Sequence, residues 1–353
     1  MSNKYKKFLP ILIAGIVTGV CSVLLTVFGN PANMGFCIAC FLRDTAGALG
    51  MHGAAPVQYV RPEIIGLVVG ALVVSLVSRE FKPQSGSAPL TRFVLGIVVM
   101  IGSLVFLGCP LRMIIRLGGG DLNALVGLAG FVAGVGGGVL FLNKGFSLGR
   151  AYTQTKTEGF MPSALVLAVL AFLVVFPTML IFSESGPGSM HAPVAVSLIA
   201  GLAVGGLAQR SRLCTMGGVR DAYMFRDFTL LTGFLAIFLT VFIGNLITGK
   251  LNIGFADQPI AHTEWLWNFL GMALVGVASV FLGGCPLRQL ILAGSGSGDA
   301  GITVLGLIAG AAICHNFGLA SSAAGTTPAG RVAVLIGFLV CGAIGFTNIR
   351  KKS

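Results

Sequence analysis

Ten long apolar segments dominate this chain of 353 residues and limit the folds open to it. Each is long enough to cross the hydrocarbon core of a membrane, which is about 30 Å thick. Only 10% of the residues are charged and 55% are hydrophobic, too little charge to cover a water-soluble protein of this length. We therefore expect an all-α, polytopic membrane protein in a lipid bilayer. The apolar segments run at about 8–28, 60–78, 92–108, 122–141, 162–182, 191–209, 228–248, 265–284, 300–319 and 331–348.

Four shorter apolar pieces lie between these segments, at 36–48, 110–117, 213–225 and 286–293. They are too short to span a membrane. Irregular backbone at membrane depth is tolerated where protein surrounds it, so these pieces are predicted to be re-entrant or broken half-helices. The sequence thus predicts about ten full spans and four short helices.

Two motifs occur twice in the same order, about half the chain apart. Residues 108–112 and 284–288 both read GCPLR. Upstream of each copy, residues 37–44 and 214–221 both fit the pattern C-x5-R-D. Two shared motifs in one order indicate an internal duplication.

The predicted repeats are 1–185 and 186–353, each with five full spans and two half-helices. An odd number of spans places the second repeat upside down relative to the first, as in many transporters with a site near the bilayer midplane. The predicted outer loops at 183–190 and 320–330 contain no lysine or arginine. This asymmetry follows the positive-inside rule, so we expect both termini in the cytoplasm and no nucleic-acid partner behind the net charge of +12. The basic residues expected inside are Lys4, Lys6, Lys7, Arg79, Lys82, Arg92, Lys144, Arg150, Lys156, Arg210, Arg212, Arg226, Arg350, Lys351 and Lys352.

The two GCPLR motifs have the composition of a helix start that attracts an anion. Pro110 and Pro286 suit the first turn of a helix, where their missing N–H is no loss. The free N–H groups and positive dipole end of such a helix point into the protein. The positive charges of Arg112 and Arg288 are unfavourable beside this positive helix end. An anion bound there interacts favourably with both the guanidinium and the helix dipole. A buried arginine costs ~2.5–3.5 kcal/mol on insertion scales, so we expect a compensating guest.

The alternative is that each arginine only neutralises an aspartate. Both roles can coexist if the aspartate orients the guanidinium and the anion takes the remaining donors. The available pairs are Arg43 with Asp44, Arg220 with Asp221, Arg112 with Asp121 and Arg288 with Asp299.

Four of the eight cysteines occupy matched positions in the two copies: Cys37, Cys109, Cys214 and Cys285. A thiol is a weak, polarisable donor, which suits an anion that exposes a terminal sulfur or selenium and must later leave. We expect these thiols and the arginines to face one shared, water-accessible cavity. Three of the four unmatched cysteines, Cys21, Cys314 and Cys341, are expected to pack as small apolar side chains.

Cys37 and Cys40 also form a C-x-x-C pair, which is typical of redox sites. The second copy has Gly217 in the place of Cys40. A membrane-embedded thiol oxidoreductase using Cys37 and Cys40 therefore stands as one alternative, and a non-selective small-anion channel as another. We expect a non-enzyme with no metal and no cofactor, since the histidines are scattered.

Two further stretches carry a family resemblance. Residues 209–214 fit Q-x-S-x-x-C, and Gly283 and Gly284 precede Cys285. In these motifs, and over essentially its whole length, the chain resembles the YeeE/YedE family of sulfur-transport membrane proteins. The resemblance implies an importer in the bacterial inner membrane whose four matched cysteines pass a sulfur anion along. It also implies a small cytoplasmic sulfurtransferase of the TusA type as a partner.

The residues after the central cysteine depart from the thiosulfate-importing branch of that family. Small polar residues and a histidine follow it there, whereas Pro286, Leu287 and Arg288 follow it here. This form looks more like the YedE branch described as a selenium transporter. The resemblance therefore leaves a selenium species and a thiosulfate-like anion as candidate substrates.

Overall fold

The computed structural model describes residues 2–349, with side chains from residue 8 onward. It confirms the all-helical class and the ten segments long and apolar enough to cross a membrane. The charges expected at Lys4, Lys6, Lys7 and 350–352 lie outside the described side chains. The long helices are α1 (Ser2–Val27), α3 (Pro62–Val77), α4 (Pro89–Phe106), α6 (Asn123–Asn143), α7 (Lys156–Val175), α8 (Val194–Ser211), α10 (Thr229–Ile247), α11 (Trp265–Leu282), α13 (Gly298–Asn316) and α14 (Pro328–Thr347).

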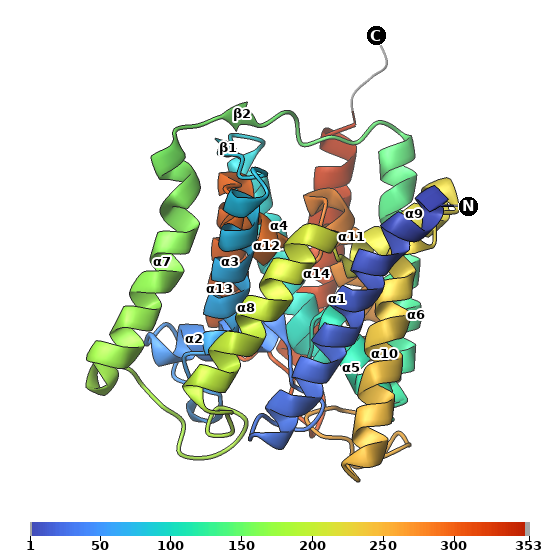
Figure 1. Ribbon diagram of the computed structural model, residues 1–353. Coiled ribbons are helices and arrows are strands. Elements are labelled where there is room, and N and C mark those ends of the chain that lie inside the picture. The colour runs from blue at the N-terminus through green and yellow to red at the C-terminus, as the bar shows by residue number, and fades with distance from the viewer. Residues whose placement is uncertain (1, 350–353) are drawn as a thin grey trace.

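The four predicted short helices are also present. They are α2 (Ile38–Ala48), α5 (Pro110–Gly118), α9 (Thr215–Phe225) and α12 (Pro286–Gly294). Figure 1 shows α2 and α5 toward one end of the bundle and α9 and α12 toward the other. Two 3-10 turns, η1 (Ala55–Val57) and η2 (Pro177–Met179), and a two-residue antiparallel pair, β1 (Gln84–Ser85) with β2 (Tyr152–Thr153), complete the described elements.

Glycines allow the long helices to pack closely. A Cβ on Gly205 of α8 would lie 2.2 Å from the carbonyl oxygen of Leu67 in α3. A Cβ on Gly134 of α6 would lie 2.0 Å from the carbonyl oxygen of Ala273 in α11. Small residues at such crossings let the two backbones approach closely. In a membrane, where the hydrophobic effect does not hold helices together, this close van der Waals packing does.

The helix contacts follow a regular pattern. α3 packs against α8, and α10 packs against α1; α6 packs against α11, and α13 against α4. Likewise α5 contacts α10, and α12 contacts α3. If each of α1–α6 is replaced by the corresponding helix of α8–α13, and the reverse, every helix pair named above becomes another pair of the same set. The seventh helices break the pattern, because α7 contacts α3, α12 and α13 whereas α14 contacts α4 and α11.

The first and last described helices meet at one end of the bundle. α1 begins and α14 ends at the end that also carries β1 and β2 (Figure 1). Lys82 precedes β1 and Arg150 precedes β2 in the chain. This end therefore carries basic side chains, as the charge pattern predicts for one face of the membrane.

Candidate functional site

Each of the four matched cysteines is the N-cap of a short helix. Cys37 precedes α2, Cys109 precedes α5, Cys214 precedes α9 and Cys285 precedes α12. The Cys37 sulfur accepts the N–H of Cys40, and the Cys214 sulfur accepts the N–H of Gly217, both at 3.3 Å. Four thiols thus lie where the unpaired N–H groups and positive dipole ends of four helices converge.

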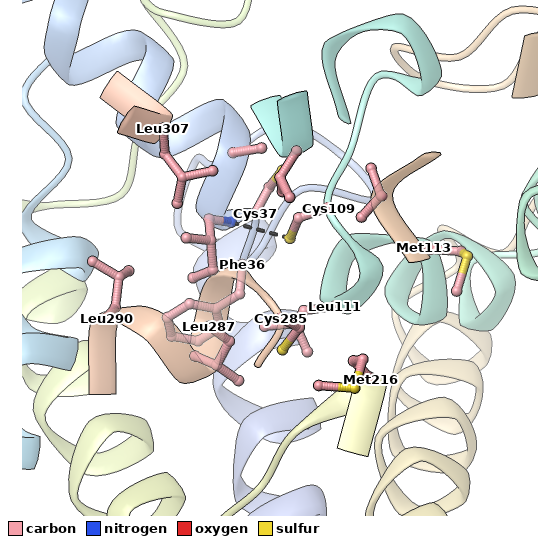
Figure 2. Close-up of a cluster of buried hydrophobic side chains, with 14 of the residues drawn as sticks. Phe36, Cys37, Cys109, Leu111, Met113, Met216, Cys285, Leu287, Leu290 and Leu307 are labelled. Atoms are coloured by element: carbon pink, nitrogen blue, oxygen red, sulfur yellow. Dashed lines mark hydrogen bonds between the residues drawn. The ribbon is translucent and has the colours of Figure 1, made fainter. Parts of the chain in front are cut away.

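The N-capping thiols lie in two groups. The Sγ atoms of Cys214 and Cys285 are 3.8 Å apart. In the other group, the backbone N–H of Ile38, next to Cys37, donates to the Cys109 sulfur at 3.3 Å (Figure 2). Each group combines one cysteine of the C-x5-R-D motif with the GCPLR cysteine that follows it.

All four thiols are buried in one hydrophobic cluster. Phe36, Leu111 and Leu287 belong to the same cluster and lie near the sulfurs in Figure 2. The expected shared, water-accessible cavity is therefore wrong for this conformation, because apolar side chains fill the space around the thiols. Two cavities, of about 360 and 460 Å³, are lined by none of the candidate cysteines or arginines. The larger, between α5, α6, α9 and α10, reaches Thr215 beside Cys214.

Arg112 is fully buried and saturated by the chain itself. Its Nε donates to the carbonyl of Asn33 at 3.0 Å, and its Nη1 donates to the carbonyl of Leu107. Nη2 donates to the carbonyl of Ile260 at 3.3 Å, and the Cys40 sulfur lies 3.7 Å from Nη1. Carbonyl groups and a thiol, rather than a carboxylate, therefore surround this charge.

Arg288 occupies the same motif position in the second copy but has a different environment. Its exposed fraction is 8%, and its Nη1 is buried without a hydrogen-bond partner among the described residues. The described acidic groups form no ion pair with it. Arg288 follows Cys285 by three residues in the first turn of α12, and the Cys285 sulfur lies 3.8 Å from that of Cys214. A buried cation with an open donor thus lies at the start of α12 beside two thiols.

The two downstream aspartates have other partners. Asp121 pairs with Arg116 at 2.7 Å, both fully buried, and also accepts the N–H of Asn123. Asp299 accepts the N–H of Gly86 at 2.8 Å and lies 3.8 Å from Arg92. The alternative in which these aspartates neutralise Arg112 and Arg288 is therefore not the arrangement in the structure.

The pairing expected in the C-x5-R-D motifs is present. Arg43 contacts Asp44 at 2.6 Å, and Arg220 contacts Asp221 at 2.8 Å. The first pair is buried, and Arg61 donates to the other carboxylate oxygen of Asp44. These contacts occupy Arg43 and Arg220 with carboxylates, so they are weaker anion sites than Arg288.

Sequence reasoning missed Arg61, Arg116 and Thr215. Arg61 and Arg116 are fully buried, and they pair with Asp44 of α2 and with Asp121 after α5. Thr215 is the first residue of α9, and its Oγ1 is buried without a hydrogen-bond partner among the described residues. A basic residue inside an apolar segment was the available signal for Arg116, which follows Arg112 by one helical turn.

The C-x-x-C pair has the geometry of a helix cap. Cys37 and Cys40 are both free thiols, and the Cys40 backbone N–H donates a hydrogen bond to the Cys37 sulfur. The Cys40 side chain contacts Arg112. Both thiols are therefore engaged in positioning α2 and Arg112.

Comparison with known proteins points to sulfur transport. Residues 210–340 match the family model described as sulphur transport. The matched segment begins within the Q-x-S-x-x-C stretch and includes α9, α11, α12 and α13, with both Cys214 and Cys285.

A curated relative matches over a shorter stretch. The chain is 26% identical over 108 residues to the thiosulfate transporter TsuA of Escherichia coli strain K12. This alignment covers 30% of the chain and 30% of the relative's length.

Proposed function

We propose that this chain is a membrane importer of a small anion that exposes a terminal sulfur or selenium atom. The observation that carries the proposal is Arg288, a buried cation with an unpartnered donor at the start of α12, beside Cys214 and Cys285. The helix dipole and the guanidinium attract the negative charge. The two thiols offer weak donors to the sulfur or selenium end.

The helix contacts support an inverted duplication with repeats 1–185 and 186–353. The set of helix partners is unchanged when α1–α6 are exchanged with α8–α13. The two groups of half-helices lie toward opposite ends of the bundle (Figure 1). In this proposal Cys37 and Cys109 form an outer station of the path, and Cys214 and Cys285 form an inner one.

The buried thiols make this conformation a closed one. An anion moving between the two stations has to pass Phe36, Leu111 and Leu287, which fill the cluster around the sulfurs. Alternating access in inverted-repeat transporters moves one repeat against the other around a fixed site. In the outer station, such a movement breaks the hydrogen bonds that Arg112 donates to backbone carbonyls.

The similarity to a thiosulfate transporter supports a thiosulfate-like substrate, and the open donor of Arg288 favours a guest with full negative charge. Arg43 and Arg220 are each paired with an aspartate, so we assign them a structural role beside the path. We place the protein in the bacterial inner membrane with both termini in the cytoplasm. A sulfurtransferase of the TusA type is the proposed cytoplasmic acceptor.

Uptake into proteoliposomes tests the proposal against its alternatives. We expect uptake of labelled thiosulfate to fall sharply in Cys285→Ser and to persist in Cys40→Ser. A thiol oxidoreductase built on Cys37 and Cys40 predicts the reverse. Uptake that survives replacement of all four N-capping cysteines supports a non-selective channel.

A further inference from the structure

A second buried charge lies away from the thiols, in the first turn of α3. Glu63 is fully buried, and the described basic residues form no ion pair with it. Its Oε1 accepts from Asn30 Nδ2 at 2.9 Å and from Ser197 Oγ at 3.0 Å. Its Oε2 is buried without a partner among the described residues. An ionisable group inside a span with only neutral partners is costly, and such groups mark proton and ion pathways.

The surroundings can support both protonation states of Glu63. Two donors on Oε1 and the positive end of α3 favour the carboxylate. Burial and the unpartnered Oε2 make a charged carboxylate costly at this position. The nearest cation in sequence, Arg61, is engaged by Asp44 and by the carbonyls of Pro187 and Met190.

The other titratable groups of the neighbouring elements are few. Tyr59 interacts electrostatically with Glu63 and stacks on His191 at 3.9 Å between ring centroids. Asp44 and Arg43 of α2 are paired with each other. α8 contributes Ser197 to the Glu63 carboxyl. Glu63 is therefore the carboxyl of this region that lacks a counter-charge.

Glu63 is linked to the outer thiol station through one segment. Asn30 lies in the segment 28–36 that leads to Cys37, and the Asn30 amide also accepts the N–H of Ala192 at 2.8 Å. Three residues later, the carbonyl of Asn33 accepts from Arg112. Protonation of Glu63 removes the charge that strengthens the Asn30 contact, which loosens the segment between Arg112 and Cys37.

We propose that Glu63 is a proton-binding site that couples transport of the anion to a pH gradient, with the proton carried on Oε2. This inference goes beyond the proposed importer and rests on it for the coupling step. The proton binding itself is a property of the free protein. The two can therefore be tested separately.

Proteoliposomes with an imposed pH difference test the coupling. We expect wild-type uptake to be faster when the side of anion entry is acidic. For one proton per anion, the accumulation ratio changes about tenfold per pH unit. In Glu63→Gln the rates with and without the pH difference become equal, while anion exchange continues and reports an intact anion path. Glu184→Gln, which alters an exposed carboxylate, is the control and keeps the wild-type response.

Infrared difference spectroscopy of the purified protein tests proton binding without any anion. We expect the carbonyl band of a protonated carboxyl to titrate in the wild type, to vanish in Glu63→Gln and to shift in Glu63→Asp. A wild type without a titrating carboxyl band overturns the proposal, as does a Glu63→Gln variant that still responds to the pH gradient. If no anion is taken up at all, the importer proposal fails and the infrared titration still decides the proton site.

Discussion

The sulfur atoms of Cys214 and Cys285 lie 3.8 Å apart although the residues are 71 positions apart in the chain. Each cysteine is the N-cap residue of a different half-helix, and the Cys214 sulfur accepts the backbone N–H of Gly217. The proximity follows from α9 and α12 directing their N-termini to one point, where a guest atom can contact both thiols at once. The same proximity has chemical consequences that can be measured.

A disulfide should form readily between these two thiols under mild oxidation. A disulfide needs sulfur atoms about 2.05 Å apart, so a small approach of α9 and α12 is enough. We expect oxidation to remove the free thiols of Cys214 and Cys285 together and to block uptake, with recovery after reduction. Peptide mapping by mass spectrometry measures the bond, and Cys214→Ser is the control that cannot form it. If oxidation blocked uptake while the thiols of Cys214 and Cys285 both stayed free, the result would contradict the role of this pair in uptake.

Arg112 and Arg288 should respond in opposite ways to the same substitution. Arg112→Gln leaves the buried carbonyls of Leu107 and Asn33 without their donors, and each costs about 1–3 kcal/mol of unfolding free energy. Arg288→Gln removes a buried charge that has no ion pair, so stability should be unchanged or higher. Thermal unfolding in detergent compares the two variants. Equal losses of stability would show that Arg288 is as structurally engaged as Arg112.

Removing the carboxylate of Asp121 should destabilise the protein strongly. Asp121→Asn leaves Arg116 as a buried, unpaired charge, which costs about 3–5 kcal/mol. The double variant Arg116→Met with Asp121→Leu should recover much of this loss, because an apolar pair replaces the ion pair. Glu184→Gln, at an exposed position, is the control for loss of a carboxylate. A single Asp121→Asn variant as stable as this control would disprove the importance of the pair.

A methyl group at Gly134 should separate two helices. The Cβ of Gly134→Ala would lie 2.0 Å from the carbonyl of Ala273, so α6 and α11 have to move apart and lose stability. Gly342→Ala is the matched control in α14, since no heavy atom lies within 4 Å of its added Cβ. The difference is measured as the melting temperatures of the two variants. Equal melting temperatures for Gly134→Ala and Gly342→Ala would contradict the close packing of α6 and α11.

The helices were predictable from the sequence because apolar length and proline fix them locally. Pro110 and Pro286 set the first residues of α5 and α12 within the expected ranges 110–117 and 286–293. The spans followed from hydrophobic length alone. The matched motifs also identified the four N-capping cysteines, since each motif begins a short helix.

Side-chain partners were not predictable, because they depend on helix rotation and on distant loops. Asp121 is close in sequence to both Arg112 and Arg116, and the turn after α5 brings Arg116 to it. The carbonyls around Arg112 include that of Ile260, which no local pattern could identify. The closed packing around the thiols was missed for the same reason, because Phe36 and Leu287 come from opposite halves of the chain.

Binding of thiosulfate to the purified protein tests the central claim most directly. A ligand at 100 times its dissociation constant stabilises the folded state by about 2.7 kcal/mol, so the melting temperature of the wild type should rise with thiosulfate. Arg210→Gln, an exposed arginine of α8, should keep this rise. The account predicts that Arg288→Gln loses it, and an equal rise in Arg288→Gln would contradict an anion site at the start of α12.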